Sequence, residues 1–224
     1  MSKRSIDYRA YFLLNMNPVI RFMIMADVIW RGATGFLAPI FAIFIIDRIN
    51  GGNAAVAGIA ATIYLFSKSF FQIPFASIID QIRGEKDDYW FLIVGSVMSS
   101  VIPILYLWVH TPAELYITQL MYGLASAAMF PSWSAIFTRH MDEHKEGIEW
   151  GAYFTLTDLS AAGAAAIGGV LAVTSGFPTL IIASVFLNLI SCFFYVPIKS
   201  HMHIPVHHDQ PIQERTSENK TVPM

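Results

Sequence analysis

Charged residues are scarce in this sequence: they make up 13% of its 224 residues, whereas hydrophobic residues make up 55%. Soluble domains usually carry about 25% charged residues, so this composition excludes an ordinary water-soluble domain. Cysteine is nearly absent too, and the single Cys192 excludes an internal disulfide. The formal net charge of −2 offers no basic surface, so we expect no nucleic-acid partner.

The sequence motifs of common catalytic sites are missing as well. The chain has no Gly-x-Ser-x-Gly nucleophile elbow, no His-Glu-x-x-His zinc helix and no glycine-rich phosphate-binding loop. We therefore expect no enzyme, no metal site and no cofactor. The histidines beyond residue 200 lack an acidic or cysteine partner at a fixed spacing, which makes them a weak metal site.

Long apolar runs are what the chain has instead. Six of them reach the roughly 20 residues with which a helix crosses about 30 Å of hydrocarbon, and unpaired backbone groups in lipid favour helices. The predicted spans are 18–46, 53–79, 89–109, 113–137, 150–174 and 177–198. The sequence thus predicts an all-α membrane protein with a cytoplasmic N-terminal segment (1–17), a six-helix domain (18–198) and a disordered cytoplasmic tail (199–224).

Basic residues gather on one side of these spans. If the N-terminus is cytoplasmic, the outer side holds Arg48 alone. The inner side then holds Lys3, Arg4, Arg9, Arg21, Arg83, Lys86, Arg139, Lys145, Lys199, Arg215 and Lys220. The positive-inside rule therefore places both termini in the cytoplasm of a multi-pass protein of an inner or plasma membrane.

A loop motif follows the second span, in the run Ala76-Ser-Ile-Ile-Asp-Gln-Ile-Arg-Gly-Glu-Lys86. It resembles the signature loop of the major facilitator superfamily: a glycine, three residues, an aspartate and a basic residue, then a glycine followed by basic residues. Ala76 and Gln81 depart from that pattern, and one extra residue precedes the second glycine. The resemblance assigns a gating role to Asp80, Arg83, Gly84 and Lys86.

A second resemblance covers residues 115–151. The segment 123–131, the following Arg139 and the Glu146-Gly147 turn look like the fourth helix, the inner loop and the start of the fifth helix of this family. Gln119 stands where the drug antiporters of the family carry an arginine, so the resemblance does not extend to their proton mechanism.

Members of this family normally have twelve helices, in two six-helix halves that face each other across a central cavity. The resemblance implies that this chain is one such half, built of two three-helix repeats. A half alone would expose its cavity face to lipid, so we expect two copies to form a two-fold homodimer. The alternatives are a heterodimer with a separate second half, or a shortened form of a longer chain.

Four ionisable residues lie within the spans and are the main site candidates, together with Gln119: Asp27, Arg31, Lys68 and Asp158. Asp27 and Arg31 share a helix face and can pair, and Asp27 is the expected proton carrier. The second and fifth helices of opposite halves meet in the family, which would bring Lys68 of one copy near Asp158 of the other. The simpler interpretation is that these residues only hold helices together.

The same family packing would bring Asp80 to residues 146–151 of the other copy, where exposed N–H groups favour an anion. We therefore predict a proton-coupled or facilitative secondary transporter of a small solute that works by alternating access in the lipid bilayer. A membrane assembly or regulatory subunit that keeps the fold without transport is the alternative.

Overall fold

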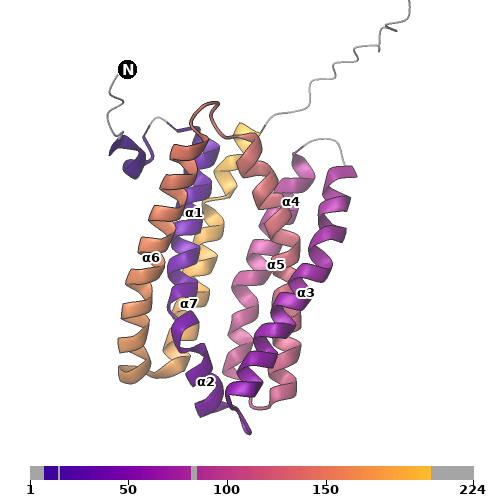
Figure 1. Cartoon of the computed structure of the whole chain (residues 1–224), viewed down its shortest axis with the longest axis vertical. Coiled ribbons are helices and arrows are strands. Elements are labelled where there is room, and N and C mark those ends of the chain that lie inside the picture. Colours follow the sequence, from indigo (N-terminus) through magenta and orange to yellow (C-terminus); the bar gives the residue numbers. More distant parts are fainter. Residues whose placement is uncertain (1–7, 15, 82–84, 203–224) are drawn as a thin grey trace, which may run out of the picture.

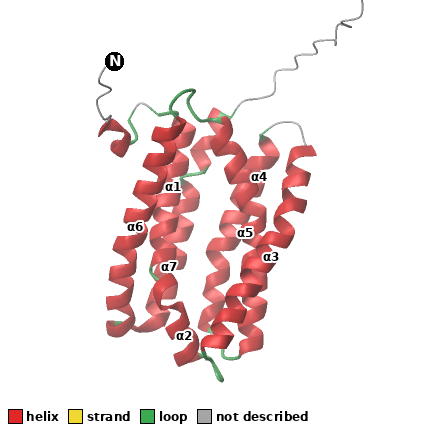
Figure 2. Ribbon diagram, viewed as in Figure 1, coloured by secondary structure: helices red, strands yellow, loops and turns green. Residues whose placement is uncertain are grey.

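The computed structural model describes residues 8–14, 16–81 and 85–202, and every regular element in these ranges is a helix (Figures 1 and 2). Within them, six helical spans are long and apolar enough to cross a membrane, which confirms the predicted fold class. The disordered tail is predicted over 199–224, but the 3₁₀ helix Val196–His201 includes its first three residues. Residues 1–7 and 203–224 lie outside the described residues. The elements are η1 (Tyr8–Phe12), α1 (Pro18–Gly35), η2 (Ala38–Ile40), α2 (Phe41–Arg48), α3 (Ala54–Gln81), α4 (Lys86–Val101), η3 (Ile102–Leu107), α5 (Pro112–Arg139), α6 (Glu146–Thr174), α7 (Gly176–Phe193) and η4 (Val196–His201).

Prolines divide three of the six spans into an α-helix and a 3₁₀ segment. The first predicted span, 18–46, is interrupted after α1 by η2, which contains Pro39. Pro103 and Pro197 lie at the starts of η3 and η4, which extend α4 and α7. Proline lacks the backbone N–H and clashes with the carbonyl four residues earlier, so a regular helix gives way to a tighter turn here.

Local capping fixes where two of the spans begin. The Asn17 side chain accepts a hydrogen bond from the backbone N–H of Val19 at 2.9 Å, at the start of α1. Thr111 and Glu114 form a reciprocal capping box at the start of α5. Such caps satisfy backbone donors that have no partner inside the helix.

The helices form two groups, α1 with α6 and α7, and α3 and α4 with α5 (Figure 1). The first helix, α1, therefore packs mainly against helices of the last three spans, and α5, the first helix of those three, packs mainly against helices of the first three. This exchange interlocks the two halves of the chain in one bundle.

Small residues let the two main helix pairs approach closely. A Cβ at Gly168 of α6 would lie 2.4 Å from the carbonyl oxygen of Phe36, just after α1. A Cβ at Gly123 of α5 would lie 2.6 Å from the Tyr64 carbonyl oxygen of α3. The Ser160 hydroxyl adds a hydrogen bond to the Val28 carbonyl oxygen at 2.7 Å. Close packing and hydrogen bonds of this kind hold helices together in lipid, where apolar surface gives no drive for association.

Two buried apolar clusters lie toward opposite ends of the bundle. The end where η1 and η4 lie is called the terminal end here, and the opposite one the far end (Figure 1). The terminal-end cluster includes Ile20, Leu92 and Phe137. The far-end cluster includes Ile45 and Leu115. Large apolar side chains such as Phe66, Ile73, Val173 and Phe193 are exposed, as expected of a surface that faces hydrocarbon.

Candidate functional site

The Asp27 carboxylate is buried in the middle of α1 and is bound by two tyrosines. The Tyr195 hydroxyl donates to Oδ1 at 2.7 Å, and the Tyr153 hydroxyl donates to Oδ2 at 3.0 Å. Tyr153 comes from α6, and Tyr195 follows α7. The two donors satisfy a carboxylate that water does not reach, as a buried polar group requires.

Arg31 and Asp27 lie on the same side of α1, but the structure does not join them in an ion pair among the described residues. Arg31 is exposed, and its guanidinium lies 5.9 Å from the centre of the Trp30 ring. Instead of the expected pairing with Arg31, the two Asp27 oxygens accept hydrogen bonds from Tyr153 and Tyr195. Arg31 still attracts the Asp27 carboxylate through space.

Lys68, on α3, is brought to the same region as Arg31. Its Nζ lies 4.7 Å from the centre of the Phe130 ring, within the usual range for a cation–π contact. No carboxylate lies within ion-pair distance of Lys68 in the described part of the chain.

Asp158 is exposed on α6, on the surface of the six-helix bundle. No ion pair of Asp158 with Arg31 or Lys68 occurs in the described part of the chain. The four predicted ionisable residues thus divide into one buried carboxylate, two cations without a carboxylate partner and one separate exposed carboxylate.

A cavity of about 250 Å³ lies between α1, α2, α3, α5 and α7. Gln119 lines it, as expected, and its Nε2 donates to the Tyr106 hydroxyl at 3.1 Å. The rings of Tyr64 and Tyr122 stack with their centres 5.2 Å apart. The polar lining residues are Thr34, Tyr64, Tyr106, Gln119, Tyr122, Ser184 and Asn188.

Asn188 gives this cavity an unused acceptor. The side chain is 1% exposed, and its Oδ1 finds no hydrogen-bond partner among the described residues. An unsatisfied buried carbonyl is costly, so a ligand that donates a hydrogen bond would be favoured here. Gln119, Asn188 and Tyr122 are recognisable in the sequence as polar residues within apolar spans, whereas the roles of Tyr153 and Tyr195 at Asp27 have no such signal.

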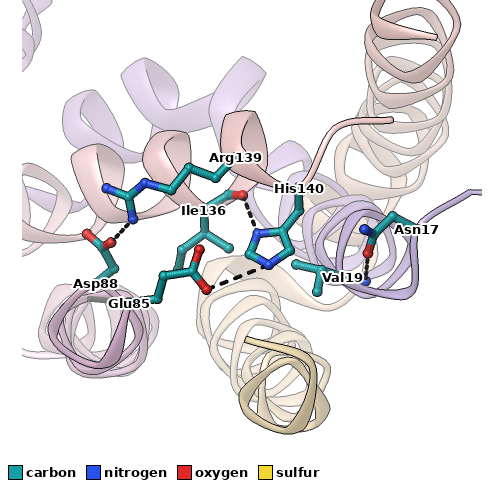
Figure 3. A network of polar contacts seen from close by, with 7 residues as sticks. All are labelled: Asn17, Val19, Glu85, Asp88, Ile136, Arg139 and His140. Carbon is teal, nitrogen blue, oxygen red and sulfur yellow. Dashed lines mark hydrogen bonds and ion pairs between the residues drawn. The ribbon is translucent and has the colours of Figure 1, made fainter. Parts of the chain in front are cut away.

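Polar contacts also connect α4 and α5 at the terminal end (Figure 3). The Arg139 guanidinium donates to the buried Asp88 carboxylate. His140 Nδ1 lies 3.0 Å from the Ile136 carbonyl oxygen, and its Nε2 lies 3.7 Å from a Glu85 carboxylate oxygen. These contacts hold the start of α4 against the end of α5.

The predicted gating loop lies next to these contacts. Asp80 is exposed and lines a groove of about 510 Å³ together with Arg139, between α3 and α5. Lys86 is exposed at the start of α4. The predicted residues Arg83 and Gly84 lie outside the described residues. Arg139, whose ion-pair partner is Asp88, was not among the predicted gating residues, yet it lines the same groove as Asp80.

Comparison with known proteins adds a family and a fold. Residues 24–218 match the sequence model of the Major Facilitator Superfamily. The in meso crystal structure of the POT family transporter PepTSo is similar, with a TM-score of 0.61 and 14% identity over 85% of this chain and 39% of that one. At this identity the likeness shows the fold alone, and the chain spans 39% of that transporter's length. Curated protein sequences contain no match.

Proposed function

The chain belongs to the major facilitator superfamily, and we propose that it is a secondary transporter that moves a small solute across the bilayer by alternating access. The family, together with a fold like that of a transporter, favours transport over catalysis. The solute occupies the cavity lined by Gln119 and Asn188. This cavity combines apolar and aromatic walls with a few polar groups, as small-molecule sites usually do.

The observation that carries this proposal is the placement of charge. Arg31 and Asp158 are exposed in mid-span, and Lys68 is half-buried. A charged side chain at the centre of a bilayer costs about 2.5–3.5 kcal/mol even on the lower scales, so such residues normally face protein or water. A second lobe facing this six-helix bundle, with a water-filled path between the lobe and the bundle, would remove this cost.

The facing lobe in this proposal is a second copy of the chain. Two copies related by a two-fold axis would supply the two halves that a transport path requires. Asp80 of one copy then lies near the start of α6, residues 146–151, of the other. The N–H groups at that helix start attract an anion, and the contact closes the path at the terminal end.

The terminal end faces the cytoplasm in this proposal. Among the described residues, Arg48 lies at the far end. The terminal end carries Arg9, Arg21, Lys86, Arg139, Lys145 and Lys199. The positive-inside rule favours this orientation.

Asp27 is the proposed proton carrier. Its carboxylate is buried between Tyr153 and Tyr195, and no ion pair neutralises it within the described chain. A proton would remove the charge without moving a helix, and Arg31 lies one helical turn away on α1. Protonation therefore changes the electrostatic balance on the face that lines the path.

Purified protein in vesicles that contain a pH-sensitive dye tests this function. The outer buffer is acidic, and acidic, neutral or basic aromatic solutes are added to it. A solute that the protein transports should cause protons to enter the vesicles. Asp27→Asn should abolish the coupling, while Asp47→Asn, an exposed carboxylate at the far end, should leave it unchanged. If the vesicles never move protons or solute, the alternative of an assembly or regulatory subunit would be favoured. If Asp27→Asn couples solute to protons as well as the unaltered chain does, Asp27 is not the proton carrier.

A further inference from the structure

Arg31 and Lys68 are two cations without a carboxylate partner. No carboxylate among the described residues lies within ion-pair distance of either. Both instead contact aromatic rings, Trp30 and Phe130 respectively. Aromatic contacts stabilise cations only partly, so the pair attracts any anion that reaches it.

The two cations lie at one rim of the cavity. Thr34, which lines the cavity, is three residues after Arg31 on α1, and Tyr64, which also lines it, is four residues before Lys68 on α3. Each cation is therefore about one helical turn from the lining. Because α1 and α3 run in opposite directions, both cations lie on the terminal-end side of the cavity.

The cavity itself is lined by uncharged groups. Its polar residues are hydroxyls and amides, and its aromatic face is the stacked Tyr64–Tyr122 pair. The unpartnered Oδ1 of Asn188 accepts hydrogen bonds. A space of about 250 Å³ with this lining suits a ring or short chain that carries a hydrogen-bond donor.

We propose that the solute is an organic anion whose carboxylate, or a comparable anionic group, binds between Arg31 and Lys68 while its uncharged part fills the cavity. This inference rests on the proposed transport function for its meaning, but the binding it describes is measured separately. A guanidinium and an ammonium on opposite sides of one carboxylate give charge-assisted hydrogen bonds from two helices. Binding of the anion would also neutralise positive charge that α1 and α3 both carry on this side of the cavity.

Matched acid and amide probes test the proposal on the purified full chain in nanodiscs. The probes are N-acetylphenylalanine and indole-3-acetate, each compared with its neutral amide, and binding is measured by calorimetry. Each acid should bind at least about ten-fold more tightly than its amide, with affinity that falls as salt is added. Equal affinity of acid and amide, or failure of both acids to bind, would overturn the proposal.

Variants locate the anionic group. Arg31→Gln and Lys68→Gln should each weaken acid binding about ten-fold or more without changing the weak binding of the amides. Arg48→Gln removes a cation at the far end and should leave both unchanged. Arg31→Lys retains the charge and should retain part of the acid affinity, which separates a lost contact from a failure to fold. Unchanged acid binding in Lys68→Gln and Arg31→Gln would refute the site.

The competing occupant is Asp158 of a second copy. If Lys68→Asp is inactive and Lys68→Asp/Asp158→Lys restores transport, the cation is neutralised by that carboxylate, and the anion proposal is wrong. Vesicle uptake distinguishes failure of the anion site from failure of the transport function. Acid binding without uptake would reject the transport function and keep the anion site. Uptake confined to neutral or basic solutes would reject the anion site and keep the transport function.

Discussion

The Tyr195 hydroxyl binds the Asp27 carboxylate at 2.7 Å across 168 positions of sequence. The contact joins the end of the last span to the middle of the first, and Tyr153 of α6 makes the second contact, at 3.0 Å. One buried carboxylate thus ties together α1, α6 and the segment after α7. Its protonation state and the packing of this helix group are therefore linked.

Removing a hydroxyl from this site tests that link. Tyr195→Phe and Tyr153→Phe should each lower the free energy of unfolding by about 1–3 kcal/mol, because each leaves a buried carboxylate oxygen without a donor. In an Asp27→Asn background the same changes should cost less, with a coupling of at least about 0.5 kcal/mol. Denaturant unfolding in detergent measures this, and Tyr11→Phe at an exposed tyrosine is the control. Equal costs in both backgrounds would contradict the linkage.

Two adjacent glycines of α6 provide a matched test of helix packing. A Cβ at Gly168 would lie 2.4 Å from the Phe36 carbonyl oxygen, whereas a Cβ at Gly169 meets nothing within 4 Å. Alanine usually favours a helix over glycine by about 1 kcal/mol. Gly169→Ala should therefore leave the thermal midpoint unchanged or raise it, and Gly168→Ala should lower it. Identical midpoints would show that α1 and α6 are not in close contact here.

The Arg139–Asp88 pair should respond asymmetrically to mutation. The Asp88 side chain is 1% exposed and the Arg139 side chain 41%. Arg139→Gln leaves a buried charge and should cost on the order of 3 kcal/mol, whereas Asp88→Asn leaves an arginine that water can reach and should cost less than about 1 kcal/mol. Lys145→Gln, at the surface pair with Asp142, should cost about 0.5 kcal/mol.

The double variant Arg139→Gln/Asp88→Asn completes this comparison. It should be more stable than Arg139→Gln alone, because the unpaired buried charge is gone. If the double variant is no more stable than Arg139→Gln, the buried charge that Arg139 neutralises is not that of Asp88.

Anion binding and proton binding should favour each other. The charged and titratable groups near Asp27 are Arg31 on its own helix, Tyr153 on α6 and Tyr195 after α7. An anion at Arg31 offsets the positive charge that stabilises the Asp27 carboxylate, so the two binding events are linked. Calorimetry of N-acetylphenylalanine in two buffers of different ionisation enthalpy should reveal proton uptake, absent in Asp27→Asn. Binding without proton uptake in the unaltered chain would contradict this coupling.

Much of the fold follows from the sequence, because span length and apolar content are local properties. The break at Pro39 was not predicted, although proline chemistry explains it once the helix is seen. Helix spacing correctly put Asp27 and Arg31 on one side of α1, but spacing cannot decide which partner satisfies a carboxylate. That choice depended on Tyr153 and Tyr195, which lie 126 and 168 residues away and carry no motif. Likewise, the common position of Arg31 and Lys68 beside one cavity follows only once Thr34 of α1 and Tyr64 of α3 are seen to line it.

Counting copies in single vesicles shows whether transport needs two copies of the chain. Each copy carries one fluorophore, and the protein is reconstituted at an average below one copy per vesicle. The copy number of each vesicle is recorded together with its uptake of an acidic aromatic solute. Vesicles with one copy should take up no solute, and uptake should begin with two copies, because the path lies between two six-helix halves. Uptake at the same rate per copy in vesicles that hold a single copy would contradict this expectation.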